Sequence, residues 1–175
     1  MSNSGSTKSG NPRADDIVLR APVPEDGMKV HQLVAACPPL DPNSVYCNLL
    51  QCSHFSSTSV AATLDGELVG FISGYCLPER PDTVFVWQVA VGEAARGCGL
   101  ATKMIRFILS QPACETVSYL ETTITEDNNA SWALFTGAAR KLDADINSSV
   151  FFDKNTHFQG EHDSEMLVRI GPFSV

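Results

Sequence analysis

Blocks of apolar residues separated by polar turns predict the elements of this chain. The run Val84–Val91 is rich in β-branched and aromatic side chains and predicts a buried strand. A short polar turn follows it, and then a helix whose apolar face is formed by Leu100, Met104, Phe107 and Ile108. The rest of the chain is organised around this strand, turn and helix.

The remaining blocks extend the pattern on both sides of that stretch. Before it, we expect a strand at Ile17–Arg20, a helix from Glu25 that ends before Pro38, a helix at Val45–Cys52 capped by Ser44, and a hairpin of Ser59–Leu64 and Leu68–Tyr75 around Asp65 and Gly66. After it, we expect a strand at Val117–Thr125, a helix at Asn129–Leu142, and strands at Ile146–Phe152 and Glu165–Ile170. The inward faces of the expected helices comprise Val30, Leu33, Val34, Leu49, Leu50, Ala130, Ala133, Leu134 and Ala138. This order predicts an α+β fold with a mixed, mostly antiparallel central sheet flanked by helices.

Composition and charge narrow the class of protein. Residues 1–16 are polar and rich in Ser, Gly and Asn, which predicts a disordered tail before a single domain at residues 17–175. The net charge of −8 argues against nucleic acid or an anionic membrane as a partner. It suits a cationic substrate, and it equally suits a protein of a saline cytoplasm. No apolar run reaches the roughly 18 residues of a membrane span, and the N-terminal residues lack the apolar region of a secretory signal.

Six cysteines are scattered along the chain without Cys-x-x-Cys spacing or matching histidines. This pattern favours free thiols and no metal site, and hence a cytoplasmic protein.

The polar turn after the strand has the composition of an anion site. Gly97 and Gly99 let the backbone approach a ligand, and the first N–H groups of the following helix are unpaired and favour negative charge. Arg96 adds a positive charge. The turn lacks the Lys-Ser/Thr of a P-loop and the third glycine of a dinucleotide fingerprint. We therefore expect a phosphate-bearing ligand of another class.

The full register, from Gln88 through Val91 and five further residues to Gly97-x-Gly99, resembles the acetyl-CoA motif of the GCN5-related N-acetyltransferase superfamily. The first position of that motif is Glu93 or Ala94 here, in place of Gln or Arg. The resemblance covers about Ile17 to Ile170 and implies that acetyl-CoA is a co-substrate and that the backbone N–H of Val89 polarises the thioester. It assigns to the cofactor Val89, Ala90, Val91, Arg96, Gly97, Cys98, Gly99, Leu100, Ala101 and Thr102.

A second block agrees with the first. Asn128, Ser131 and Leu134 match the superfamily's motif on the helix after the fifth strand. The resemblance implies that Asn128, Ser131 and Phe135 contact the cofactor. Phe135 stands where the superfamily has the Tyr that serves as general acid. Asn128 read alone is equally a helix cap.

Four stretches resemble, more narrowly, the diaminobutyrate acetyltransferases of ectoine biosynthesis. They are Pro38–Leu49, Trp87–Val91, Glu121–Phe135 and His157–Glu165. This resemblance implies acetyl transfer to the γ-amino group of L-2,4-diaminobutyrate, a homodimer, and a role in making a compatible solute. It implies a substrate site formed by Asp41, Tyr46, Trp87, Gln88, Thr123, His162 and Glu165.

A diamino acid needs carboxylates in its pocket, and the acidic candidates are assigned different tasks. We expect Glu121 to act as the base, and Asp41 and Glu165 to hold the α-ammonium. The rival hypotheses are another small-molecule or protein N-acetyltransferase of the same fold, and a non-catalytic acyl-CoA-binding module that keeps the glycine turn.

Overall fold

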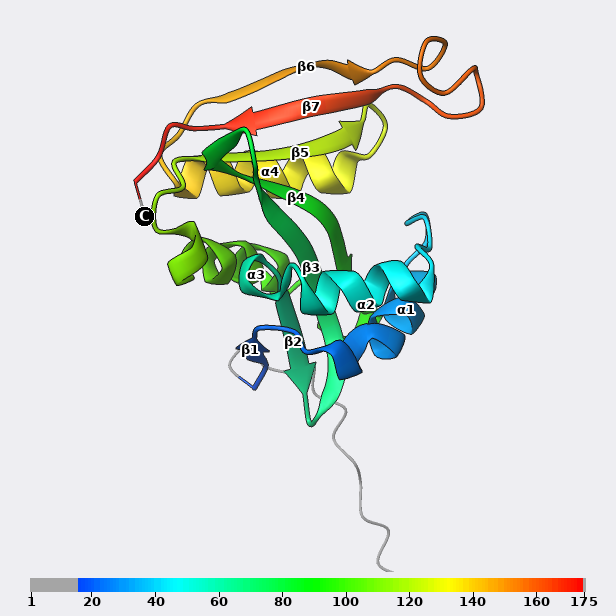
Figure 1. Cartoon of the computed structure of the whole chain (residues 1–175), viewed down its shortest axis with the longest axis vertical. Coiled ribbons are helices and arrows are strands. Elements are labelled where there is room, and N and C mark those ends of the chain that lie inside the picture. The colour runs from blue at the N-terminus through cyan, green and yellow to red at the C-terminus, as the bar shows by residue number, and fades with distance from the viewer. Residues whose placement is uncertain (1–15, 175) are drawn as a thin grey trace, which may run out of the picture.

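The computed structural model describes residues 16–174 (Figure 1). Apart from Asp16, the tail expected over residues 1–16 lies outside this range.

The described strands form one sheet of seven, in the order β1-β2-β3-β4-β5-β7-β6. They are β1 (Val18–Arg20), β2 (Val60–Leu64), β3 (Glu67–Leu77), β4 (Arg80–Val91), β5 (Tyr119–Thr125), β6 (Ile146–Phe152) and β7 (Glu165–Ile170). Neighbouring strands are antiparallel except for β4 and β5, which run parallel. The predicted mixed, mostly antiparallel sheet is confirmed.

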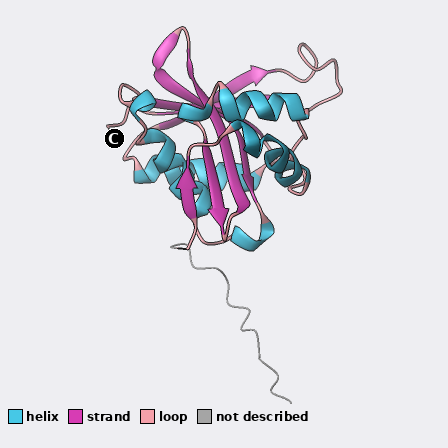
Figure 2. Cartoon of the chain, turned by 60° about the horizontal axis from the view of Figure 1, so that its bottom comes forward, coloured by secondary structure: helices cyan, strands magenta, loops and turns pink. Residues whose placement is uncertain are grey.

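Helices cover both faces of this sheet (Figure 2). They are α1 (Gly27–Ala35), α2 (Val45–Ser53), α3 (Leu100–Leu109) and α4 (Asn129–Lys141), with 3-10 turns at Pro24–Asp26, Ser56–Thr58, Glu93–Ala95 and Pro112–Cys114. α1 and α2 bury Val30, Val34 and Cys52 against Phe71 and Ala90 of the sheet. α3 and α4 pack on the opposite face, in the larger core cluster.

Local signals in the sequence explain where several elements begin. The Ser44 side chain accepts a hydrogen bond from the Cys47 N–H at 3.1 Å, which starts α2 as predicted. Asp65 and Gly66 both have positive φ, at 51° and 83°, as the two-residue hairpin turn between β2 and β3 requires. The expected hairpin is confirmed.

β4 begins four residues earlier than expected, at Arg80 instead of Val84. The sequence predicts a loop around Pro81, because proline has no N–H for a sheet ladder. In the structure Cys76 pairs with Val84 while Leu77 pairs with Arg80, so Pro81 lies in an irregularity of the ladder where its missing N–H costs little.

Two helices bury residues that differ in part from those expected, although Ala138 of α4 is buried as predicted. In α2, Asn48 and Gln51 are buried while Leu49 is 37% exposed. In α4 the buried residues are Phe135, Ala138 and Ala139, whereas Ala130 and Ala133 are exposed. The α4 difference follows from size, because burying one phenylalanine ring removes far more apolar surface from water than burying two alanines.

Candidate active site

β4 and β5 are hydrogen-bonded over only part of their length. Residues 83–85 pair with residues 119–121, and within the described chain β4 then continues to Val91 without a β5 partner. Figure 1 shows the two strands diverging beyond this point. The backbone of β4 is therefore open on this side to an extended ligand.

The N–H groups of Val89 and Val91 point toward this opening. The Gly92 N–H donates to the Val69 carbonyl on β3 at 2.9 Å. Because the polar groups of successive strand residues alternate between the two sides, Val89 and Val91 face away from β3. Val89 is thus placed to donate to an oxygen held between the strands, as expected for an oxyanion site.

A β-bulge lies directly before Val89. Ser73 pairs with Gln88 and Gly74 pairs with Val86, which leaves Trp87 as the extra residue of β4. The Trp87 side chain is 45% exposed. A bulge turns the side chains that follow it, and bulges recur beside active sites for that reason. Trp87 is therefore available as a wall for a substrate, the role expected of it.

The glycine turn has the geometry of a phosphate cradle. Gly97 and Gly99 have φ of 77° and 75°, and a Cβ added at either would meet nothing within 4 Å. Gly99 is the N-cap of α3, and no side chain caps this helix, so the first N–H groups of α3 remain available to an anion. Arg96 is exposed, and its Nε donates to the Val91 carbonyl at 3.0 Å. These residues fit the pyrophosphate of coenzyme A.

Asn128 caps the start of α4, which is the alternative interpretation of this residue. The Asn128 side chain accepts a hydrogen bond from the Ser131 N–H at 3.1 Å. Phe135 is only 1% exposed and belongs to the core. A phenyl ring has no proton to give, so α4 provides no acid at this position. The contacts of Asn128, Ser131 and Phe135 with a cofactor remain a prediction.

The loop between α1 and α2 contacts β4 and carries Asp41, one of the residues expected to bind the substrate. The Gln88 side chain donates to the Asp41 carbonyl at 3.3 Å and accepts from the Asn43 side chain at 3.0 Å. Asp41 is exposed, and Tyr46 at the start of α2 is 70% exposed. The backbone of Asp41 is thereby held against Gln88, the residue that follows Trp87 on β4. Contact of Asp41, Tyr46, Trp87 and Gln88 with a substrate remains a prediction.

Thr123 and Glu165 share the outer face of β5 and β7, because Thr123 is opposite Leu167 and Thr125 is opposite Glu165. His162 lies in the loop before β7. Its ring packs on Phe158 at 4.8 Å between centroids, and its Nδ1 is 2.7 Å from the Asp163 carbonyl. The structure thus places Thr123 and Glu165 on one surface and holds His162 by contacts within its own loop.

Glu121 is bound into an ion-pair cluster. Arg80 donates to both carboxylate oxygens, at 2.6 and 2.8 Å, and Arg169 donates to Oε1. Burial alone would raise the pKa of Glu121, but the hydrogen bonds from the two arginines outweigh it and lower that pKa. Arg169 also stacks on the Tyr119 ring at 3.8 Å.

This geometry does not support Glu121 as the base. The residue pairs with Phe85, where β4 and β5 are still joined, four residues before Val89. At about 3.3 Å per strand residue, that separation is roughly 13 Å along β4. A carboxylate with a lowered pKa and both oxygens engaged is also a weak proton acceptor. The sequence pattern does not indicate these two arginines as partners of Glu121, because they lie far from it in the chain.

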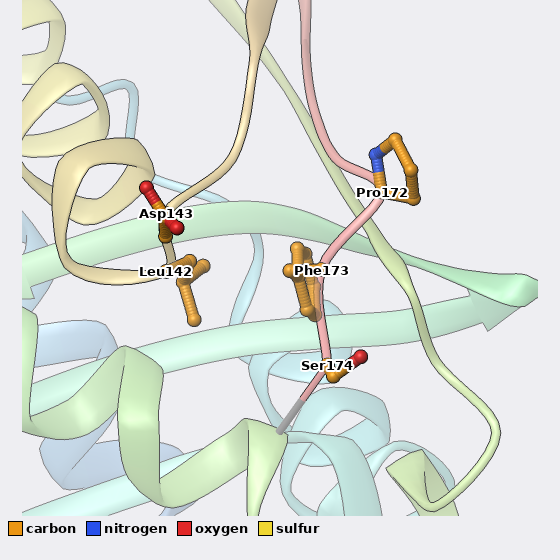
Figure 3. A pocket seen from close by; sticks show the side chains of 5 residues that line it. All are labelled: Leu142, Asp143, Pro172, Phe173 and Ser174. Carbon is orange, nitrogen blue, oxygen red and sulfur yellow. The ribbon is translucent and has the colours of Figure 1, made fainter.

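Other features of the described chain do not compete with this site. The hollow in Figure 3 is lined by Leu142, Asp143, Pro172, Phe173 and Ser174, beside the C-terminal end of α4 and away from the helix N-termini described above. Among residues 16–174 no group of three His, Cys, Asp or Glu side chains could hold a metal ion. No helix of that range is long and apolar enough to cross a membrane. The six cysteines are free.

Diverging parallel strands beside a glycine turn at a helix N-terminus indicate an acyltransferase of the coenzyme A-dependent class. The chain belongs to the acetyltransferase (GNAT) family, which its residues 28–138 match. It is 61% identical to the L-2,4-diaminobutyric acid acetyltransferase of Methylotuvimicrobium alcaliphilum, over 91% of this chain and 92% of that protein. It is 49% identical to the protein of the same name from Halomonas elongata, over 93% and 84% of the two chains.

A solved structure agrees with these relatives. The diaminobutyrate acetyltransferase EctA from Paenibacillus lautus, in complex with L-2,4-diaminobutyric acid and coenzyme A, superposes with a TM-score of 0.86. The two chains are 38% identical, and the match covers 91% of this chain and 96% of that one. Ard1 from Thermoplasma volcanium, at 16% identity and a TM-score of 0.71, shares the fold. The resemblance indicated by the sequence motifs is confirmed.

Proposed function

We propose that this protein transfers the acetyl group of acetyl-CoA to the γ-amino group of L-2,4-diaminobutyrate. The product is N4-acetyl-L-2,4-diaminobutyrate, and the reaction is the acetylation step of ectoine biosynthesis. The observation that carries this proposal is the similarity over 91% of the chain to a structure that holds both diaminobutyrate and coenzyme A.

The cofactor side of the reaction rests on backbone groups. The glycine turn and the start of α3 bind the pyrophosphate, and the pantetheine arm lies along the open edge of β4 between Val89 and Val91. When bound, acetyl-CoA supplies the activated acyl group. The Val89 N–H donates to the thioester oxygen and stabilises the negative charge that develops there during attack. A thiol with a pKa of ~8.5 leaves as the thiolate, so the absence of a phenol at residue 135 is tolerable.

Acidic and aromatic side chains bind the diamino acid, which accepts the acetyl group. Asp41 and Glu165 hold the α-ammonium of the substrate, while Tyr46 and Trp87 flank the substrate. An amine with a pKa of ~10.4 must lose a proton, at a cost of about 4.6 kcal/mol at pH 7, before it can attack. Because Asp41, Tyr46 and Trp87 are exposed, this proton is released toward solvent on their side of β4.

The proposal includes a homodimer and a cytoplasmic location. β6 is an edge strand, and Val150, Phe151 and Phe152 on it are 57%, 45% and 39% exposed. An edge strand with apolar side chains is a surface for pairing with a second copy. The six free cysteines suit a reducing compartment.

The test is an amine panel. The pure protein is incubated with acetyl-CoA and diaminobutyrate, ornithine, lysine or a peptide with a free N-terminus, and thiol release is followed. We expect the highest kcat/KM with diaminobutyrate. Preference for the peptide would identify a protein acetyltransferase, and binding of acetyl-CoA without turnover of any amine would identify a non-catalytic module.

A further inference from the structure

The α1–α2 loop (residues 36–44) is tied to β4 through one amide side chain. Gln88 Nε2 donates to the Asp41 carbonyl at 3.3 Å, and Gln88 Oε1 accepts from Asn43 Nδ2 at 3.0 Å. Gln88 is 9% exposed. Both polar atoms of its amide are therefore used by the loop, and the donor and acceptor ends of the amide are fixed in direction.

His31 of α1 holds the same loop from the other side. Its Nδ1 is 3.0 Å from the Asn43 carbonyl. A carbonyl oxygen only accepts, so Nδ1 carries the hydrogen and donates. Asn43 is consequently held at two points, by its backbone to α1 and by its side chain to β4.

The anchoring residue on β4 is next to the reacting groups. Gln88 lies between the bulged Trp87 and Val89, whose N–H faces the opening between β4 and β5. The position of Asp41 is thus set relative to the same strand that holds the thioester. A shift of the loop would move the Asp41 carboxylate relative to the acetyl group.

From these contacts we infer that Gln88, Asn43 and His31 are positioning residues that fix the Asp41 loop on the catalytic strand and thereby set the affinity and nitrogen selectivity for the diamino acid. The inference rests on the proposed function. It changes the role of Gln88, because a buried amide with both ends occupied by the loop acts on the substrate through Asp41 and not by direct contact.

Because the donor and acceptor ends of the Gln88 amide have different partners, each hydrogen bond can be removed by a separate substitution. Gln88→Glu keeps the size and the acceptor for Asn43, but it sets a carboxylate against the Asp41 carbonyl. Asn43→Asp removes the donor to Gln88 and sets two acceptors against each other. Both should raise the KM for diaminobutyrate by about fivefold or more, as expected from losing one hydrogen bond, while the KM for acetyl-CoA stays constant.

The deciding experiment is a double-variant cycle with Gln88→Ala and Asn43→Ala. If both act through the same loop, the double variant has the KM of the worse single variant, and the share of α-acetyl product rises in all three. The matched control is Gln111→Ala, which removes another glutamine side chain that donates to a backbone carbonyl, at Phe107 and at 3.0 Å. This control should leave both KM values unchanged.

Each other outcome contradicts the inference. Independent, multiplying effects of Gln88→Ala and Asn43→Ala would show that Gln88 contacts the substrate directly. An unchanged KM for diaminobutyrate in folded Gln88→Glu and Asn43→Asp proteins would show that the hydrogen bonds between Gln88 and the loop do not position Asp41. If the unmutated protein acetylates no diamino acid, the proposed function fails instead, so the two failures are distinguishable.

Discussion

Glu121 shows how much a single residue depends on its neighbours. Its side chain is 2% exposed and lies between Arg80 and Arg169, which belong to strands on either side of it. Three strands are thereby joined through one carboxylate. We assign it to stability, because removing one partner of a buried ion pair leaves uncompensated charge behind.

Replacing Glu121 by Gln tests that assignment. We expect the variant to lose about 2 kcal/mol of unfolding free energy at pH 7, because two guanidinium groups then face a neutral amide. This loss is smaller than for a fully buried pair, since the Arg80 and Arg169 side chains are 45% and 32% exposed. The pKa of this carboxyl is lowered in the folded state, so its contribution is complete above the unfolded value of ~4.3 and is lost as pH falls through the folded pKa. Urea unfolding at pH 7 and pH 3 should show the gap between the two proteins narrowing.

The exposed Glu126→Gln variant provides the baseline for this comparison. A loss of kcat in Glu121→Gln that is recovered in alkaline buffer, without a change in stability, would restore Glu121 as the base.

The glycine turn is the element that we propose binds the pyrophosphate of acetyl-CoA. Gly99→Ala adds a methyl group at φ of 75°, in the open space where the phosphates are expected. We expect about 1–2 kcal/mol of backbone strain and a rise in the KM for acetyl-CoA of about tenfold.

Gly66→Ala is the control for this variant. It imposes a similar strain at φ of 83° in the β2–β3 turn, also with nothing within 4 Å. It should lose similar stability and keep its acetyl-CoA affinity. Equal KM values in the two folded variants would remove the turn from the cofactor site.

Element order and the β4–turn–α3 unit could be predicted from the sequence because each has a strong local signal. β4 has a continuous apolar run, α3 follows a glycine turn, and α2 and α4 begin at the side-chain caps Ser44 and Asn128. The turn between β2 and β3 needs residues that accept positive φ. The buried faces of α2 and α4 could not be predicted from apolar periodicity. Periodicity does not rank the large Phe135 above the small alanines, and it gives no reason for the polar Asn48 to be buried.

The site was predictable only where residues lie close in sequence. The residues of the glycine turn share one segment, and so do Trp87 and Gln88. The partners of Glu121 are 41 and 48 positions away in the sequence, and those of Gln88 are 45 and 47 positions away. These contacts depend on how strands and loops pack in the folded protein. The divergence of β4 from β5 likewise belongs to the sheet and has no sign in either strand's sequence.

At the scale of the whole molecule, the β6 edge predicts assembly. Light scattering of the pure protein at micromolar concentration should give twice the chain mass of 18.9 kDa. Phe151→Lys should shift the mass toward one chain, because a charge on an edge strand opposes strand pairing. A matched Lys at exposed Ala133 of α4 should leave the dimer intact. A monomeric unmutated protein would contradict this interface.

The position of the acetyl group in the product shows which amine of the diamino acid reaches the thioester. The unmutated protein is incubated with acetyl-CoA and L-2,4-diaminobutyrate, and the product is identified by proton NMR. We expect the γ-acetyl isomer alone, because Asp41 and Glu165 hold the α-ammonium away from the thioester at Val89. Formation of the α-acetyl isomer, or no acetylated product, would contradict it.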